Sequence, residues 1–359
     1  MRILQLAPLW ERVPPPAYGG IEYVVGVLTE ELMRLGHDVS LVASGDSQTS
    51  GRLRAVYGRS LRTAPDIADA NPYCWLHVAA ALGEARDFDI VHNHAGELPM
   101  ALHRLCATPM LTTLHNLITP DHRSIWDVYG GFYNTPSHAA REGISHPNFV
   151  GVVYHGIDVP SFPFRANKGD YLLFLSRMSP EKGPLEAIEV AKRLGRPLVM
   201  AGKVDAKDHA FFWSAVAPHI DGRLVEYRGE ADHALKRELY AGASCLLFPI
   251  KWNEPFGLVL AEAMACGTPV VAFRAGAAPE VVAHGRSGYL VDDVDGMAEA
   301  VKRLDKLDPT RIREYVEARF SAPIMAAAYV RAYARTVEQS ELARRRLWRK
   351  PQPPSRLAG

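Results

Sequence analysis

The sequence has few cysteines, almost no net charge and no long apolar run. Its four cysteines lie far apart with no paired spacing, which predicts neither a disulfide framework nor a cysteine zinc site and favours a reducing, cytoplasmic compartment. Lys plus Arg number 41 and Asp plus Glu 40, so the net charge of +1 gives no field that would attract nucleic acid. No run of 18 apolar residues occurs, so we expect no transmembrane helix. The first ten residues do not predict a signal peptide.

The composition is that of a globular enzyme, with 48% hydrophobic and 23% charged residues. A chain of 359 residues is too long for one ordinary core, which predicts two domains. Its oligomeric state has no signature in the sequence.

Short apolar runs alternate with helical patterns along the whole chain. Strands are expected in the first half at Arg2–Ala7, Val39–Ala43, Ile90–Asn93, Met110–Leu114 and Phe149–Tyr154. Those of the second half are Tyr171–Ser176, Leu198–Ala201, Val225–Tyr227, Cys245–Pro249, Val270–Phe273 and Gly288–Val291. The clearest helices are Ile21–Leu35, Glu181–Leu194, Leu258–Cys266, Met297–Leu307 and Ile324–Ala343. Apolar strands separated by helices indicate parallel sheets covered on both faces, so the fold class is α/β with two doubly wound, Rossmann-like domains.

A cluster of prolines and glycines in Asp158–Asp170 predicts the domain boundary, giving domains 1–160 and 161–323. Beyond the last helix, residues 344–359 form a basic, proline-rich tail. The simplest interpretation is a solvated tail, and a weak contact with a membrane surface or a partner is the alternative.

The segment from Asn253 to Val282 carries the strongest functional signal. It places Glu254 and Glu262 eight residues apart, with Pro255 expected in the first turn of an apolar helix between them. The backbone N–H groups of the next three residues, Phe256, Gly257 and Leu258, would form a positive helix N-terminus suited to phosphate. Glu254 would lie at the helix mouth and Glu262 about two turns inside. This order suits a ligand with a central diphosphate and hydroxyl-rich rings at both ends, whereas the plainer alternative is a packed helix with two solvated glutamates.

The same segment resembles the E-x7-E signature of retaining glycosyltransferases of family 4, and GTPVVAF and GAAPEVV that follow match the family as well. The resemblance implies the GT-B fold, in which two Rossmann-like domains face a cleft and the final helix, here 324–343, crosses back to the first domain. It implies metal-independent transfer of a hexosyl unit from a nucleotide diphosphate sugar to a hydroxyl acceptor, with UDP the first carrier to consider and GDP the next. Glu254 would then position the sugar, and Glu262 would bind the ribose hydroxyls.

Two cations flank the turn after the strand at Tyr171–Ser176. Arg177 and Lys182 are five residues apart across a strand-to-helix turn, so both can face one anion. A lysine near a helix start is slightly unfavourable, which points to a purpose beyond charge decoration. In the resembling family such a pair neutralises the diphosphate that leaves, which makes a divalent metal unnecessary.

A glycine pair opens the first helix of the chain. Gly19 and Gly20 follow a proline-rich loop and Tyr18, so a ligand could approach the backbone closely. The pair lacks the spaced G-x-G-x-x-G pattern of nicotinamide-binding folds, and we expect no cofactor. The loop resembles the family's first loop, which meets the donor phosphate and helps form the acceptor site.

Histidines concentrate in the first domain near strand ends. His92 and His94 are two residues apart, and with His115 they form a candidate metal site by H-x-H spacing. The resemblance favours another interpretation, in which no metal is bound, His115 contacts a hydroxyl of the donor sugar and His94 lines the acceptor side. His155 stands where the family's N-G-[VI]-D element has asparagine, and no role follows from it.

Nucleotide contacts are expected from two strand ends of the second domain. Gly202 ends one strand, and Arg228, Gly229 and Glu230 end the next. In the resembling family, backbone groups of the latter turn hold the base, and such contacts leave no side-chain signature of its identity.

Two alternative functions are compatible with the same residues. One is a phosphorylase or sugar-nucleotide epimerase of the same fold, which needs a phosphate site or a second acid pair that the sequence does not display. The other is a non-catalytic sugar-nucleotide binding subunit. The acceptor itself has no sequence signature.

Overall fold

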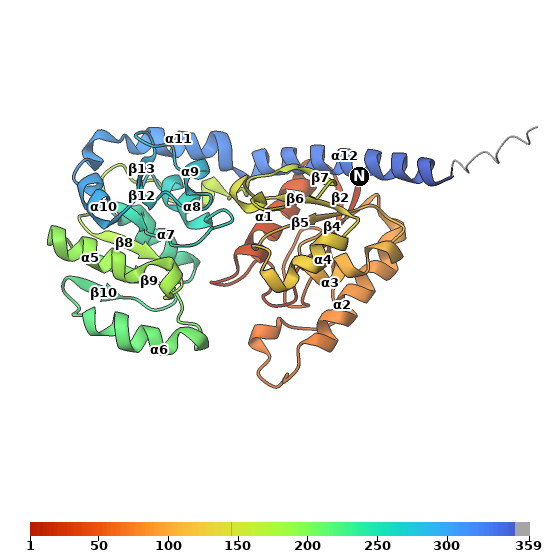
Figure 1. Ribbon diagram of the computed structural model, residues 1–359, viewed down its shortest axis with the longest axis horizontal. Helices are drawn as coiled ribbons and strands as arrows, with labels where there is room; N and C mark the ends of the chain where they lie inside the picture. Colours follow the sequence, from red (N-terminus) through yellow and green to blue (C-terminus); the bar gives the residue numbers. More distant parts are fainter. Residues whose placement is uncertain (145, 349–359) are drawn as a thin grey trace, which may run out of the picture.

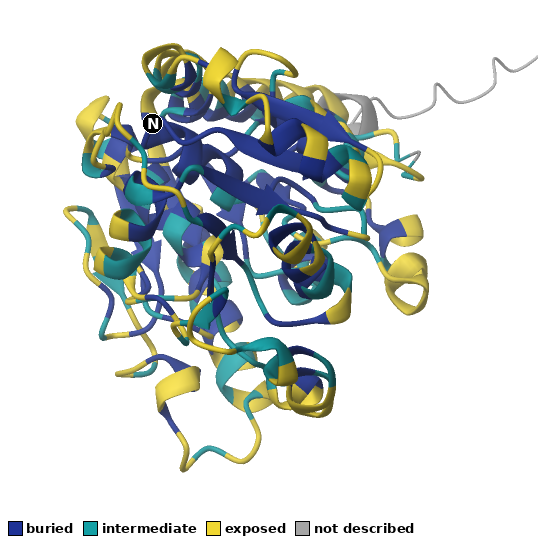
Figure 2. Cartoon of the chain, turned by 90° about the vertical axis from the view of Figure 1, so that its left-hand side faces the viewer, coloured by how far each residue is buried: buried dark blue, intermediate teal, exposed yellow. Residues whose placement is uncertain are grey.

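The computed structural model describes residues 1–144 and 146–348, and in the last helix it describes side chains as far as residue 343. The basic tail therefore lies outside the described side chains. The molecule has two parallel β-sheets side by side, each covered by helices (Figure 1). The strands are its most deeply buried parts (Figure 2).

The first sheet has seven strands in the order β3-β2-β1-β4-β5-β6-β7. These are β1 (Arg2–Leu6), β2 (Asp38–Val42), β3 (Arg52–Arg54), β4 (Ile90–Asn93), β5 (Met110–Thr113), β6 (Phe132–Thr135) and β7 (Phe149–Val152). The helices of this half are α1 (Gly20–Arg34), α2 (Asn71–Glu84), α3 (Glu97–Ala101) and α4 (Arg123–Val128). The strand order reverses between β1 and β4, which creates a switch point at the carboxyl ends of the strands.

The second sheet has six strands in the order β10-β9-β8-β11-β12-β13. These are β8 (Leu172–Leu175), β9 (Leu198–Ala201), β10 (Val225–Tyr227), β11 (Cys245–Phe248), β12 (Val270–Phe273) and β13 (Gly288–Val291). The helices are α5 (Pro184–Leu194), α6 (His209–Phe211), α7 (His233–Gly242), α8 (Leu258–Ala265), α9 (Ala278–Val281), α10 (Val294–Val301) and α11 (Pro309–Phe320). Its own switch point lies between β8 and β11.

The last helix, α12 (Ala322–Trp348), leaves the second half of the molecule and lies along the first (Figure 1). Its Met325, Tyr329 and Tyr333 are buried against Ile3 and Leu28 in the first core. The two crossings between the halves run together, because Ile157 pairs with Ser321 in a parallel bridge. The prediction that the final helix crosses back is confirmed.

The predicted α/β class with two Rossmann-like sheets is confirmed, and all eleven predicted strands are present. The sequence analysis missed β3 and β6, because the first has only three residues at a sheet edge and the second is half polar. Two predicted helix starts were wrong. The left-handed Gly183 (φ 77°) delays α5 to Pro184, and capping of the Gly296 N–H by Asp293 starts α10 at Val294. Among the described residues, no helix combines the length and apolar character needed to cross a membrane.

Candidate active site

The carboxyl ends of both sheets face one cavity of about 480 Å³. The first half contributes Pro8, Trp10, Glu11, residues 17–23, His115, Asn116 and His155. The second half contributes residues 175–177, Lys182, Gly202, Lys203, Glu230, Ala231, His233, Lys236, Phe248, Trp252, residues 254–259 and Glu262. The cavity therefore lies between the two switch points, where open α/β sheets bind ligands.

Helix α8 points its N-terminus into this cavity. Gly257 precedes the helix in the left-handed conformation (φ 79°), and Leu258 is the first helical residue. Pro255 therefore lies outside the helix, and its predicted place in the first turn was wrong. Glu262 is the fifth helical residue, so it lies about one turn inside rather than two. The N–H groups of Leu258 and its successor have no partner within the helix and give the cavity a positive wall.

Glu254 and Lys182 form a partly buried ion pair on the same wall. Lys182 Nζ donates to Glu254 Oε2, and Trp252 Nε1 donates to that oxygen at 2.9 Å. The ammonium also lies 4.5 Å from the centre of the Trp252 ring. Two residues predicted to be catalytic are thus direct partners. Lys182 and Trp252 hold Glu254 through the same oxygen, Oε2.

Arg177 lines the cavity near this pair but has different partners. Its guanidinium lies 3.1 Å from Glu181 and 3.3 Å from Asp205, with Asp208 at 3.8 Å. Lys203 also pairs with Asp205, at 2.7 Å. These carboxylates hold Arg177 in place before any ligand is bound, so the cation is preorganised.

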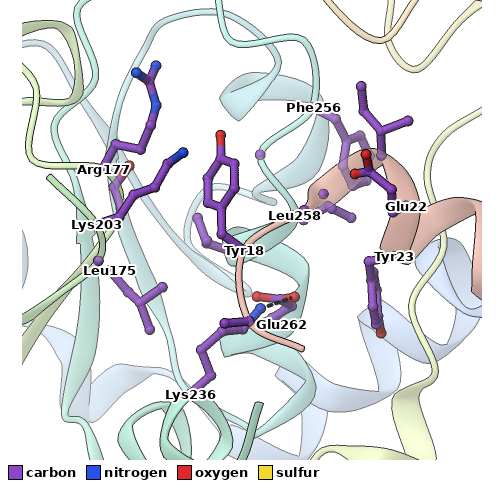
Figure 3. Close-up of a pocket in the computed structure, with 18 of the residues that line it drawn as sticks. Tyr18, Glu22, Tyr23, Leu175, Arg177, Lys203, Lys236, Phe256, Leu258 and Glu262 are labelled. Atoms are coloured by element: carbon purple, nitrogen blue, oxygen red, sulfur yellow. Dashed lines mark hydrogen bonds and ion pairs between the residues drawn. The ribbon is translucent and has the colours of Figure 1, made fainter. Parts of the chain in front are cut away.

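Glu262 is almost fully buried at the other end of the cavity wall, with both oxygens engaged. Lys236 Nζ donates to Oε1 at 2.7 Å, and the Tyr240 hydroxyl donates to Oε2 at 2.8 Å. Burial and the Glu262 charge hold the pKa of Tyr240 well above its usual value, so this phenol remains a donor. Figure 3 shows Lys236 and Glu262 joined at the floor of the cavity.

The glycine pair brings the N-terminus of α1 against that of α8. Gly19 has φ 139°, and a Cβ there would lie 2.8 Å from Pro15 Cβ. A Cβ on Gly20 would lie 3.3 Å from Leu258 Cδ1, so a side chain at Gly19 would displace the loop before α1 and one at Gly20 would press on α8.

The loop before α1 crosses to the second half of the molecule. The Pro15 carbonyl lies 2.8 Å from His233 Nε2, and Lys203 Nζ lies 3.7 Å from the centre of the Tyr18 ring. In Figure 3 Tyr18 projects into the middle of the cavity between Lys203 and Glu22. Tyr18, expected on the acceptor side, therefore lies against the cations of the second half.

The first half also touches the glutamate segment from the rear of the cleft. Ser137 Oγ donates to the Pro255 carbonyl at 2.6 Å. Glu280, from α9, accepts the N–H groups of His138 and Ala139, each at 2.8 Å. These bonds fix the segment around Glu254 relative to the first sheet.

His115 lines the cavity, and His94 lies behind it. His94 Nδ1 is 2.8 Å from His115 Nε2, and His155 stacks on the other face of His115 at 5.1 Å. His94 is buried and is not among the lining residues, so it occupies a supporting position rather than the predicted place on the acceptor side. Both ring nitrogens of His92 and of His94 bond to protein partners, which differs from the arrangement of a metal site.

The predicted base-binding turn contributes only in part. Gly202 and Glu230 line the cavity, whereas Arg228 and Gly229 do not. Arg228 is exposed and pairs with Glu226 at 2.8 Å, and the Gly229 carbonyl accepts the N–H of Gly202.

Several lining residues were missed by sequence reasoning, among them Glu11, Glu22, Lys203, Lys236 and Trp252. Burial, with a smaller contribution from the Glu11 charge, raises the pKa of Glu22 to about 7. Its position in the first turn of α1, two residues after Gly20, is a signal that could have found it. No local signal exists for Lys236, because its partner is 26 residues away.

Two family models match consecutive parts of the chain. One, described as Glycosyltransferase Family 4, matches residues 18–160, and the other, described as Glycosyl transferases group 1, matches residues 169–306. A glycogen synthase of Mycobacterium tuberculosis is 26% identical over 98% of this chain and 97% of its own length. A phosphatidyl-myo-inositol mannosyltransferase of Mycolicibacterium smegmatis is 27% identical over 93% of both chains.

Solved structures agree with the fold. AviGT4, a glycosyltransferase involved in avilamycin A biosynthesis, superposes with a TM-score of 0.71 and 26% identity, covering 94% of this chain and 98% of its own. HepE of Anabaena, solved in complex with UDP and glucose, superposes with a TM-score of 0.70 and 18% identity, covering 93% of this chain and all of its own.

Proposed function

The chain belongs to glycosyltransferase family 4 with the GT-B fold, and from this premise we propose a retaining, metal-independent transfer of a hexosyl unit from a nucleotide diphosphate sugar to a hydroxyl acceptor. One observation carries the proposal. A single cavity contains, along one wall, Arg177, the Lys182–Glu254 pair, the N-terminus of α8 and the anchored carboxylate of Glu262. These cations and carboxylates complement the phosphates and hydroxyls of a nucleotide diphosphate sugar.

In the proposed complex the second domain, 161–323, binds the donor. Glu262 accepts hydrogen bonds from the ribose hydroxyls, while Arg177, Lys182 and the free N–H groups of Leu258 and Val259 bind the diphosphate. The backbone around Gly202 and Glu230 holds the base. The sugar then lies between Glu254 and His115, which face the cavity from opposite domains.

The first domain, 1–160 with the crossing helix, receives the acceptor. Closure of the two domains around the substrates would exclude water that could otherwise hydrolyse the donor. The loop through Tyr18 and the N-terminus of α1 already bridges the cleft, so it forms part of this enclosure.

The transfer proceeds on one face of the sugar. The bond from C1 to the phosphate oxygen breaks, the bond from C1 to the acceptor oxygen forms, and the acceptor's proton passes to the departing phosphate. Glu254 offsets positive charge on the sugar ring. Preorganised cations lower the barrier by several kcal/mol in such reactions, roughly the 3–4 kcal/mol per donor seen elsewhere, so Arg177 and Lys182 take the place of a divalent metal.

A UDP-sugar is the first donor to test, and a GDP-sugar the next. HepE, which shares this fold, was solved with UDP and glucose. Thermal-shift measurements with a panel of nucleotide sugars would identify the donor, because a ligand that binds the folded state raises its apparent stability.

The reaction type is tested with the selected donor and a panel of hydroxyl acceptors. We expect release of nucleoside diphosphate only when an acceptor is present, unchanged rates in EDTA, and a product whose anomeric configuration by NMR matches the donor. An inverted product would refute retention, and a rate lost in EDTA and restored by Mg²⁺ would refute metal independence. Binding without turnover across the panel would favour a non-catalytic subunit, and phosphate-dependent release a phosphorylase.

A further inference from the structure

Behind His115 lies a network of buried polar side chains, and the hydrogen bonds that lead from Asn134 to His115 can each be assigned a direction. Its members lie on β1, β4, β5, β6 and the crossing helix α12, with His94 directly after β4, and all are buried: Gln5, His92, His94, Thr113, Asn134, Tyr329 and Tyr333. Burial lowers the pKa of His92, His94 and His115 well below the usual value, so each of these rings is neutral and has one N–H.

The hydrogen bond between Thr113 and Asn134 fixes the first donor and acceptor. Thr113 Oγ1 donates to Asn134 Oδ1 at 2.8 Å, so this hydroxyl has only lone pairs left for its other partners. His92 Nε2, at 2.7 Å from Thr113 Oγ1, must therefore be the protonated nitrogen. The other nitrogen, His92 Nδ1, then accepts a hydrogen bond from the Tyr333 hydroxyl at 2.7 Å.

The next hydrogen bonds lead through Gln5 and His94 to His115 at the cavity, and their donors follow in turn. With its hydrogen given to His92, Tyr333 accepts from Gln5 Nε2 at 3.2 Å, which turns Gln5 Oε1 toward His94. His94 Nε2 donates to that oxygen at 2.8 Å, so His94 Nδ1 is an acceptor. The His115 Nε2, 2.8 Å away, must donate to it. His115 Nδ1 is left with its lone pair.

We propose that Gln5, His94 and Tyr333 are positioning residues that hold His115 as the tautomer protonated on Nε2, so that its Nδ1 accepts a hydrogen bond from a hydroxyl bound in the cavity. Identification of that hydroxyl with the donor sugar rests on the proposed function. In this arrangement His115 orients the sugar and supplies no proton to the reaction, which agrees with transfer of the acceptor's proton to the departing phosphate.

The hydrogen-bonded network behind His115 also connects the crossing helix α12 to the candidate site. Tyr333 lies on α12, about 240 residues from His92 in the sequence, and it fixes both His92 and the amide of Gln5. Without the Tyr333 hydroxyl, the orientation of that amide is held only through His94, whose Nε2 also lies 3.1 Å from the unprotonated His92 Nδ1. A turned amide would present its NH₂ to His94 and reverse the tautomers of His94 and His115.

The tautomers can be measured without any substrate. Nitrogen-15 NMR of the histidine-labelled full-length chain at neutral pH distinguishes protonated from bare ring nitrogens, with His115→Gln and His94→Asn assigning the signals. We expect His94 and His115 both to be protonated on Nε2. A His115 protonated on Nδ1, or a charged His115, would overturn the proposal.

Two matched variants on α12 test whether the hydrogen-bonded network positions His115. Tyr333→Phe removes the hydroxyl that fixes Gln5, and Thr336→Val removes a buried hydroxyl one turn later that donates only to the Ala332 carbonyl. We expect Tyr333→Phe to shift His115 toward the Nδ1–H form and to lower kcat roughly 10- to 100-fold, the scale on which misplaced groups act. The KM for the nucleotide sugar should change little, and Thr336→Val should leave both the tautomer and kcat unchanged.

Gln5→Leu supplies a second variant in case Tyr333→Phe folds poorly. A normal kcat in Gln5→Leu and in Tyr333→Phe, with the folded state confirmed by circular dichroism, would overturn the positioning role. A wild-type chain with the expected tautomers but no transferase activity would instead count against the proposed function, so the two failures are distinguishable.

Discussion

Lys182 and Glu254, 72 residues apart in the sequence, form a partly buried ion pair in which Lys182 Nζ donates to Glu254 Oε2 beside the Trp252 ring. Lys182 is only 9% exposed. Each member therefore depends on the other for its charge to be tolerated in the cavity wall, and we predict that substitution of either changes both stability and turnover.

Glu254→Gln and Glu254→Ala should both lower turnover by about 100-fold or more, the loss typical of a removed electrostatic group. Both should also lower stability, by up to roughly 3–5 kcal/mol, because the buried Lys182 is left unpaired. The double variant Glu254→Gln/Lys182→Met removes both charges and should recover stability in thermal unfolding without recovering activity. Near-normal turnover in both single variants would remove Glu254 from catalysis.

Arg177→Ala should weaken binding of UDP by about 10- to 100-fold, in line with the 1.5–3 kcal/mol of a hydrogen bond to a charged group. Binding of uridine should change little, because the nucleoside lacks the diphosphate. The loss is enhanced because Glu181 and Asp205 lose the guanidinium that offsets their charge, while Asp205 keeps Lys203 as a partner. Calorimetric titration measures both affinities, and Arg196→Ala, which removes an arginine bonded to the Asp170 carbonyl, is the matched control. Equal losses for UDP and uridine would refute the phosphate role.

Glu262→Gln should abolish most of the preference for UDP over its 2′- and 3′-deoxy analogues. In the wild type we expect about tenfold discrimination or more, since a hydrogen bond to a charged group contributes roughly 1.5–3 kcal/mol. Tyr240→Phe keeps the carboxylate and its bond to Lys236, so it should retain most of the discrimination. If Glu262→Gln still discriminates like the wild type, the ribose is bound elsewhere.

We expect the titration of Glu22 to lower the free energy of unfolding as the pH rises from about 4.5 to about 7. Burial raises its pKa from 4.5 to about 7, so in this range the folded state holds a proton that the unfolded state has released. The stability associated with that proton is complete below pH 4.5 and lost by about pH 7, at most about 3 kcal/mol.

Glu22→Gln removes this titration. Denaturant unfolding at several pH values should show that the variant gains stability relative to the wild type as the pH rises from 4.5 to 7. Substitution of the exposed Glu142 by glutamine is the control and should leave the pH dependence unchanged. Parallel curves for wild type and Glu22→Gln would show that Glu22 titrates normally.

Much of the fold followed from local patterns. Apolar runs of strand length separated by helical periodicity predicted eleven strands, and only the short β3 and the half-polar β6 escaped because neither has a continuous apolar run. The glutamate segment was placed correctly at a helix N-terminus, but the helix begins at Leu258 rather than Pro255, because Gly257 adopts a left-handed conformation that no spacing rule reveals.

A site residue was predictable where its own sequence segment, a strand end or a helix start, indicates a ligand-binding position. Arg177, Lys182, Gly20, Glu254 and Glu262 stand directly after strands or around helix starts, and all line the cavity. The pairing of Lys182 with Glu254, the capture of Glu262 by Lys236 and the position of Tyr18 against Lys203 were not predictable. Each joins segments that only the relative placement of two sheets brings together.

The amino-acid sequence by itself determined the fold class, the family and several of the side chains that line the cavity, because these depend on periodicity and on motifs within single segments. The tertiary structure alone decided which charges are paired, why His94 lies behind His115 rather than on the cavity wall, and how Tyr333 of the crossing helix reaches His92. Those relationships depend on distances between residues up to 328 positions apart, which arise only when the two domains and α12 pack together.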